Sequence, residues 1–210
     1  MLLNPQFLLL FVPVLLLALT LHEFAHAWTA AHFGDPTPQR AGRLSLNPLK
    51  HLDPLGTLFL FVAHFGWAKP VPVNPRYFTH PRAELWVSLA GIIANVLQAV
   101  LYAAIWHLFL ETSSWGALRL IKGLVVLGVM LNLSLALFNL LPIFPLDGSH
   151  VLTQLLPRAQ ALRFRAFSER YGAIILLALL ALGYVSDVSP LQVLISIPRN
   201  WLANLLLQGF

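Results

Sequence analysis

Residues 5–28 read PQFLLLFVPVLLLALTLHEFAHAW, an apolar run that ends in two histidines with a glutamate between them. About 20 apolar residues suffice to cross a bilayer as a helix, so this stretch predicts a membrane-spanning helix. Ionisable groups inside a membrane are expensive, and they mark a functional site by default. The run lacks the positively charged start of a cleaved signal peptide, and we expect it to remain as a helix.

The rest of the chain has the same apolar character. Of its 210 residues, 58% are hydrophobic and 10% are charged, whereas a soluble domain has about 25% charged residues. Apolar segments at 84–110 and 118–141 are long enough to span a bilayer, but the segment at 52–66 is short. We therefore expect an all-α polytopic membrane bundle that forms one domain over 1–210, with a core at about 5–155 and C-terminal helices at about 157–207.

Turn-forming residues separate these segments. Residues 34–51 are rich in turns and could hold a small β-hairpin, and residues 67–82 contain four prolines, too many for a regular helix. Residues 157–170 are basic and amphipathic, which favours a helix on the membrane surface. Apolar segments follow at 171–185 and 191–207, and a proline at the centre of the last predicts a broken or interfacial helix. With no cysteine, disulfides and thiol catalysis are excluded.

His22, Glu23 and His26 form the pattern H-E-x-x-H, for which chance predicts about 0.006 matches in a chain of this composition. Positions i and i+4 share one helix face, so both imidazoles can bind one zinc ion at about 2.0–2.1 Å. Glu23 can take a proton from the attacking water and later give it to the leaving amine. The pattern predicts a metal-dependent hydrolase with Glu23 as general base.

Zinc in such a site needs a third protein ligand and one open position. Asp147 is the favoured candidate, because it follows an apolar helix, an asparagine and two prolines in NLLPIFPLDG, residues 139–148. Gly148 would let the backbone turn tightly there. His150 is the alternative ligand. Asp53, which precedes a proline, is expected to cap a helix instead.

Three pieces of sequence together resemble the site-2 protease family of intramembrane zinc metalloproteases, peptidase family M50. In chain order they are HEFAH, then GWAKPVPVNP (66–75) with SLAGIIAN (88–95), and then NLLPIFPLDG. The resemblance covers most of residues 15–155 and points to the compact subgroup without a PDZ or CBS domain. It implies an intramembrane protease in which His22, His26 and Asp147 bind one zinc ion, Glu23 is the catalytic base and Asn139 contacts substrate.

Three positions depart from the family's pattern: Ile92 and Phe144 replace a common proline, and Ser149 replaces a common glycine. No expected ligand or base is lost, so these changes bear on substrate fit more than on activity.

Small and polar residues form two sets, each spaced to lie near one helix face. The sets are Ser88, Gly91, Asn95 and Gln98, and Gly128, Asn132, Ala136 and Asn139. The favoured interpretation, Asn139 excepted, is close helix packing with interhelical hydrogen bonds. The functional alternative is that Asn95 and Asn139 bind the backbone of an unwound substrate, whose freed amides need partners where water is scarce.

The function expected from these features is hydrolysis of peptide bonds in or near the transmembrane segments of other membrane proteins, as in regulated intramembrane proteolysis. The partners would be such segments and the lipid bilayer, with no nucleic acid; the sequence leaves the oligomeric state open. A pseudoprotease that binds membrane helices without cutting would lack a ligand or a base, and neither is missing. A metal transporter would carry several ligand clusters along a path, whereas one stands out here.

The basic residues predict the orientation. A basic stretch at 40–50 follows the first helix, so the C-terminal end of that helix faces the cytoplasm by the positive-inside rule. His22 lies about 26 Å along the helix and is nearer that face. Asp147 must reach the same ion, so the 118–141 helix ends on that side too, and 52–66 must be re-entrant or interfacial. We expect a multi-pass protein of the plasma membrane.

Overall fold

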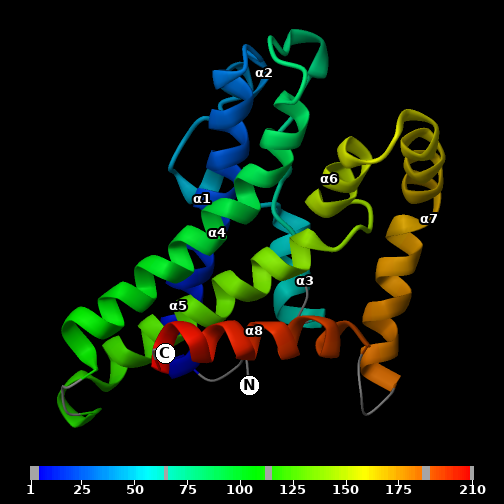
Figure 1. Ribbon diagram of the computed structural model, residues 1–210. Helices are drawn as coiled ribbons and strands as arrows, with labels where there is room; N and C mark the ends of the chain where they lie inside the picture. The colour runs from blue at the N-terminus through cyan, green and yellow to red at the C-terminus, as the bar shows by residue number, and fades with distance from the viewer. Residues whose placement is uncertain (1–4, 64–65, 112–114, 186–189, 209–210) are drawn as a thin grey trace.

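The computed structural model describes residues 5–63, 66–111, 115–185 and 190–208, and it is a bundle of helices (Figure 1). Within this part of the chain, four helices are long and apolar enough to cross a membrane: Phe7–His32, Ala83–Leu110, Leu118–Leu140 and Arg158–Gly183. The prediction of an all-α, polytopic membrane protein is confirmed.

Three long helices form the centre of the bundle. They are α1 (Pro5–His32), α4 (Ala83–Ile105) and α5 (Trp115–Leu140), and α4 packs against both of the others. A π-helical turn, η3 (Trp106–Leu110), continues α4. α1 contains Pro13, which a membrane helix tolerates.

Small residues let α4 and α5 approach closely. A side chain on Gly128 of α5 would overlap the ring of Tyr102 on α4, at 2.6 Å. Deeper in the contact, the Nδ2 of Asn95 donates a hydrogen bond to the Oδ1 of Asn132 at 2.9 Å. The predicted combination of close packing and interhelical hydrogen bonds is confirmed for these residues.

Residues 33–82 connect α1 to α4 through four short helices. These are α2 (Thr37–Arg40), η1 (Pro48–Lys50), α3 (Pro54–Ala63) and η2 (Pro75–Tyr77). Two buried side chains hold the connection together. The Asp35 carboxylate accepts hydrogen bonds from the backbone of Thr37 and Asn74 at 2.9 and 2.7 Å, and Arg43 donates to the carbonyls of Lys50 and Lys69.

The small β-hairpin considered at 34–51 does not form. Among the described residues, β-structure is limited to an isolated antiparallel bridge between Leu52 and Ala68. In the connection at 33–82, the asparagine of both Asn-Pro pairs caps a 3-10 turn instead: Asn47 accepts from the backbone of Leu49 at 3.0 Å, and Asn74 accepts from that of Arg76 at 3.2 Å. These local side-chain bonds compete with strand pairing.

α3 has 10 residues, about half the length that a span requires. The Oδ1 of Asp53 accepts a hydrogen bond from the backbone of Gly56 at 2.8 Å, so the predicted helix cap is confirmed. The length agrees with the expectation that 52–66 does not cross the membrane.

The C-terminal part contains α6 (Asp147–Leu155), α7 (Arg158–Val185) and α8 (Pro190–Gln208). The prediction of a separate surface helix at 157–170 is wrong, because no proline interrupts α7 and its basic first part continues directly into the apolar part. α8 likewise runs through Pro198 as one helix. α7 contacts α6 and α8, and α8 lies along α5 (Figure 1).

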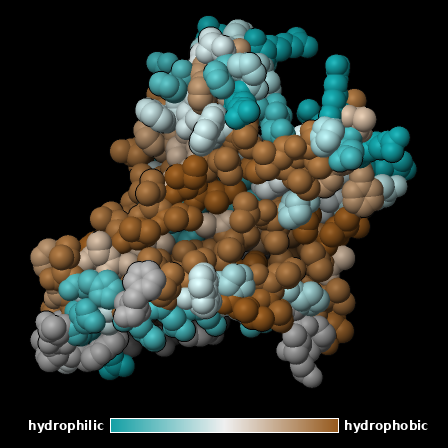
Figure 2. Space-filling view, viewed as in Figure 1, coloured by the Kyte–Doolittle hydropathy of each residue, from teal (hydrophilic) through white to brown (hydrophobic). Residues whose placement is uncertain are grey.

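The surface matches this arrangement of helices. Figure 2 shows a broad apolar band across the middle of this face, with hydrophilic residues toward its two ends. Many large apolar side chains are exposed, among them Leu97 and Leu101 on α4 and Ile174 and Leu177 on α7. Apolar surface of this extent marks contact with lipid.

Candidate functional site

α1 supplies the first part of the site. His22 and His26 are one helical turn apart and point the same way, with their Nε2 atoms 3.1 Å from each other. Both side chains are buried, as is Glu23 between them, with exposed fractions of 5%, 8% and 8% for His22, Glu23 and His26. Polar groups that are buried in this way need partners, and helix α4 supplies one for each of the two histidines.

Asp147 reaches the histidines from the other side. It is the first residue of α6, directly after the turn that follows α5. Its Oδ2 lies 3.3 Å from the Nε2 of His22 and 3.3 Å from the Nε2 of His26. Gly148 has a different role from the one predicted. Instead of forming a turn, it is helical, and a side chain there would collide with the carbonyls of Leu140 and Leu141 at the end of α5.

The three ligand atoms fit a zinc ion. They form a triangle with sides of 3.1, 3.3 and 3.3 Å, and a tetrahedral zinc with bonds of about 2.0–2.2 Å separates its ligand atoms by about 3.3–3.6 Å. The Oδ2 of Asp147 is buried and has no hydrogen-bond partner within the described part of the chain. A carboxylate oxygen that converges with two imidazole nitrogens is a typical donor set for zinc.

Helix α4 is the support on which both histidines rest. The Nδ1 of His22 lies 2.6 Å from the Oδ1 of Asn95, and the Nδ1 of His26 lies 2.6 Å from the backbone oxygen of Val87. Between these two partners is Gly91, where an added Cβ would lie 2.6 Å from the Nε2 of His22 and would overlap His26 as well. Partners of this kind on the far ring nitrogen fix the orientation of a ligating histidine.

The charge of Asp147 is set by its surroundings. Burial raises the pKa of the Asp147 carboxyl, but its electrostatic interactions and hydrogen bonds with His26 and His22 outweigh burial and hold the pKa well below its usual range. A bound divalent cation acts in the same sense. Asp147 is therefore anionic, as a metal ligand must be.

Arg43 places a positive charge near the site. From the sequence, the basic stretch 40–50 that contains it indicated only the orientation of the protein in the membrane. Arg43 is buried, and burial lowers the pKa of its guanidinium, an effect that the negative charge of Glu23 partly offsets. The 33–82 connection thus brings a fixed positive charge within electrostatic range of Glu23. The stretch 40–50 gave no sign of this, because a basic residue after a membrane helix is usually read as orientation.

The remaining predicted site residues occupy different positions. Asn139 lies near the end of α5, half-buried, and its Nδ2 donates to the carbonyl of Leu135 at 3.1 Å. Asn95 is fully buried, and its Nδ2 donates to Ala18 and Asn132 while its Oδ1 faces His22. The structure tests neither substrate contact, but it shows that the Asn95 amide already has three partners inside the protein.

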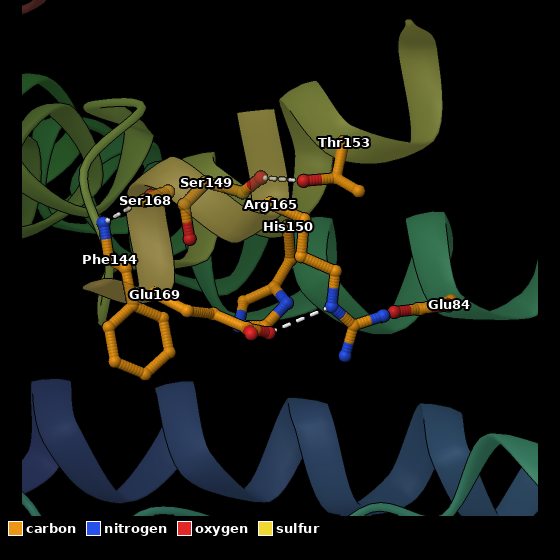
Figure 3. A pocket seen from close by; sticks show the side chains of 8 residues that line it. All are labelled: Glu84, Phe144, Ser149, His150, Thr153, Arg165, Ser168 and Glu169. Atoms are coloured by element: carbon orange, nitrogen blue, oxygen red, sulfur yellow. Dashed lines mark hydrogen bonds and ion pairs between the residues drawn. The ribbon is translucent and has the colours of Figure 1, made fainter. Parts of the chain in front are cut away.

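His150, the alternative ligand, lies outside the cluster of ligand atoms that His22, His26 and Asp147 form. Figure 3 shows it in a polar pocket between α4, α6 and α7, near the ion pair of Arg165 with Glu169. That pair has an N···O distance of 2.8 Å. The pocket is closed on one side by Phe144, whose backbone N–H donates to the Oγ of Ser168 at 3.2 Å.

Two residues of α4 that support the histidines could not be assigned from the sequence: Gly91 was assigned only to packing, and Val87 was given no role. The stretch SLAGIIAN carries part of the resemblance to the family, but the spacing of its residues cannot show that both imidazoles lie over the glycine. Val87 contributes a backbone oxygen, and any residue type at this position would provide the same group. Only the rotation of α4 relative to α1 reveals either contact.

Comparison with known proteins gives consistent matches. The sequence model described as Peptidase family M50 matches residues 110–182, which include Asp147 but not the histidines. The protein named "Putative zinc metalloprotease YwhC" from Bacillus subtilis is 43% identical over 176 residues, which are 80% of this chain and 78% of that protein.

Two mycobacterial relatives are also named as zinc metalloproteases. Proteins named "Putative zinc metalloprotease Rip2" are 37% identical over 175 residues in Mycolicibacterium smegmatis and 34% identical over 173 residues in Mycobacterium tuberculosis. These alignments cover 79% and 78% of this chain but 64% and 63% of the relatives, so the chain spans less than two thirds of their length. No solved structure matches the chain with significance. The relatives, the family match and the four apolar helices show that this chain belongs to peptidase family M50, the site-2 protease family, and is a metalloprotease of the membrane.

Proposed function

We propose that this chain is an intramembrane zinc protease that hydrolyses peptide bonds in or near the transmembrane segments of other membrane proteins. The observation that carries the proposal is the triangle of His22, His26 and Asp147, because three potential ligand atoms within 3.3 Å of one another can hold one metal ion between them. The triangle lies on helices long enough to span a membrane, or directly after one, which favours a substrate that also lies in the membrane.

Glu23 is the proposed general base. It neighbours His22 on α1 and is buried beside the ligands, so it can accept the proton of an attacking water and return it to the leaving amine. A zinc ion held by the three ligands would supply Lewis-acid polarisation of the scissile carbonyl and of the water. Burial excludes bulk water, which strengthens the electrostatic interactions of the developing charge.

Asn139 is the proposed substrate contact. It lies near the end of α5, eight residues before Asp147 and half-buried. Hydrolysis of a helical segment requires that its backbone unwind, and the freed N–H and C=O groups need partners in the bilayer. The Asn139 amide can supply one donor and one acceptor.

The proposed location is the plasma membrane, with the site nearer the cytoplasmic face. Figure 1 places α2, the start of α4 and the α6–α7 connection toward one end of the bundle. The chain carries most of its basic residues there, in 40–82 and 158–170, while Arg119, Lys122 and Arg199 lie on helices nearer the other end. This asymmetry supports the orientation by the positive-inside rule.

The first prediction tests the proteolytic activity and the base together. Purified protein in detergent is incubated with a panel of transmembrane peptides, with and without a zinc chelator. Wild type should cleave at least one peptide and lose that activity on chelation. Glu23→Gln should keep its zinc, because Glu23 is not a ligand, and lose about 100- to 10,000-fold in rate.

Two outcomes would contradict this proposal. Undiminished proteolysis by Glu23→Gln at equal metal content would remove Glu23 as the base. Tight binding of the peptides without cleavage by wild type would instead favour a protein that holds membrane helices, the first alternative considered from sequence.

A further inference from the structure

The two histidines differ in how their tautomers are determined. A neutral imidazole has one N–H, and the nitrogen without it is the one that can bind metal. The Nδ1 of His26 faces the backbone oxygen of Val87, which can only accept, so this Nδ1 carries the proton and Nε2 is free. The Nδ1 of His22 faces the side-chain amide of Asn95, which can present either an acceptor or a donor.

A chain of hydrogen bonds removes this ambiguity. It starts at the carbonyl of Gly128 on α5, which can only accept, so the Nδ2 of Asn132 must face it, at 2.9 Å. The Oδ1 of Asn132 then faces the Nδ2 of Asn95 at 2.9 Å. The opposite end of the Asn95 amide, its Oδ1, is therefore turned toward the Nδ1 of His22 at 2.6 Å.

A second acceptor enforces the same orientation. The Nδ2 of Asn95 also lies 3.3 Å from the carbonyl of Ala18 on α1. Rotating the amide by half a turn would place its oxygen against two acceptors, Ala18 and Asn132, and its nitrogen against the His22 proton. Asn95 and Asn132 are both 0% exposed, so water cannot replace the lost bonds, and an unpaired polar group in such a site is costly.

We propose that Asn95 is a positioning residue for the zinc ligand His22, and that Asn132 fixes the Asn95 amide so that a backbone carbonyl of α5 determines which nitrogen of His22 binds metal. The identity of the metal rests on the proposed function, but the tautomer does not. This role replaces a substrate contact for Asn95, because its Nδ2 and its Oδ1 already contact groups of the protein and the residue is 0% exposed.

The test compares three substitutions on α4. Asn95→Leu removes the acceptor with little change in volume. Asn95→Asp keeps a carboxylate oxygen toward His22, the arrangement found in carboxylate–histidine–zinc triads. Gln98→Leu is the matched control, because Gln98 is also a buried amide on α4, one turn further along, without a contact to either histidine.

Zinc affinity is measured by competition with a chromophoric chelator in detergent. Asn95→Leu should bind zinc about 10- to 100-fold more weakly than wild type, while Gln98→Leu should bind close to wild type. Asn95→Asp should bind more tightly than Asn95→Leu, because it keeps the acceptor for His22, but more weakly than wild type, because its second oxygen faces the oxygens of Ala18 and Asn132. Equal loss in Gln98→Leu would mean that any buried amide on α4 matters only for packing. A loss in Asn95→Asp as large as in Asn95→Leu would show that the acceptor is not what His22 needs. Either result overturns the proposal.

A second measurement needs neither metal nor activity. Nitrogen-15 NMR of the histidine rings in metal-free protein, at a pH where the imidazoles are neutral, reports the tautomer, and His22→Gln identifies the His22 resonances. Wild type should show the Nδ1–H form at His22, and Asn95→Leu should show a mixture. An unchanged tautomer in Asn95→Leu overturns the proposal. Wild type that binds zinc without cleaving any peptide would defeat the proposed function and leave this inference intact.

Discussion

Gly91 is the position at which a single carbon atom decides whether the site can form. The two imidazoles lie directly over its Cα, because the i and i+4 spacing on α1 brings both rings against one turn of α4. Helices α1 and α4 can approach this closely because Gly91 has no side chain. It lies between Val87 and Asn95, the residues of α4 that contact His26 and His22. The geometry of the site therefore depends on the missing side chain at Gly91 as much as on the ligands themselves.

Gly91→Ala should therefore impair metal binding. The new methyl group would lie 2.6 Å from the Nε2 of His22, so at least one ring must move away from the ligand position. We expect a loss of zinc content in the purified variant, measured by mass spectrometry of bound metal. Gly123→Ala is the matched control, since a Cβ there meets only the Cδ1 of Leu10, at 3.4 Å. Full zinc occupancy in Gly91→Ala would contradict the close approach.

The third ligand can be tested in the same assay. Asp147→Ala should lower zinc affinity, because two histidines alone leave the ion under-coordinated. His150→Ala should not, since His150 lies outside the triangle of ligand atoms. If zinc affinity falls in His150→Ala and not in Asp147→Ala, the third ligand is His150.

At the scale of elements, the connection between α1 and α4 is held by buried charged groups rather than by regular structure. Asp35 joins the end of α1 to Asn74, and Arg43 joins the carbonyls of Lys50 and Lys69. The backbone N–H of Lys69 also donates to the carbonyl of His51 at 2.8 Å. Most of the backbone hydrogen bonds in this connection are local turns, so these longer-range side-chain bonds help to hold its shape.

Arg43→Gln should loosen this connection. Each carbonyl that loses its buried donor costs about 1–3 kcal/mol, which corresponds to hydrogen exchange about 5- to 150-fold faster in the affected segment. Exchange is followed by mass spectrometry on peptides that cover 44–52 and 66–69. Arg40→Gln is the control, because Arg40 is exposed in the same connection. Equal exchange in both variants would show that Arg43 does not hold the segment.

The elements that could be predicted from sequence are those with strong local signals. Hydropathy alone located α1, α4 and α5, and the Asp53-Pro54 pair located the start of α3. The continuity of α7 was missed because a change from basic to apolar composition resembles a boundary, although a helix needs no change in its backbone there. The contacts of His22 and His26 with α4 could not be predicted, since they depend on how two helices are rotated about their axes.

At the scale of the whole molecule, the ligands constrain which segments cross the membrane. His22 and His26 lie in the C-terminal half of α1, and Asp147 follows the end of α5. These two helix ends must lie on the same side of the bilayer. With α3 too short to span, we expect α4 to be the single crossing between α1 and α5 among the helices that the structure describes.

Labelling of single cysteines tests this topology, and the chain has no cysteine to interfere. Arg40, Arg76, Glu111 and Arg158 are exposed positions that sample the connections between spans. A membrane-impermeant thiol reagent added to intact cells should label position 111 alone. Labelling at 76 without labelling at 40 would show that α3 crosses the membrane after all.

The contact between α1 and α4 also restricts the route by which a substrate can approach. Separating these two helices would pull His22 from Asn95 and His26 from Val87, so it would dismantle the metal ligands at the moment they are needed. A path between α1 and α4 is thereby closed to a catalytically competent enzyme. Helix α7, in contrast to α4, is packed loosely against the bundle: 17% of its span is buried, against 50% for the span that starts at Ala83. None of the three proposed metal ligands lies on α7. We therefore propose that a membrane segment approaches Asp147 from the side of the bundle that α7 covers, where its approach would leave the contacts of the histidines with α4 in place.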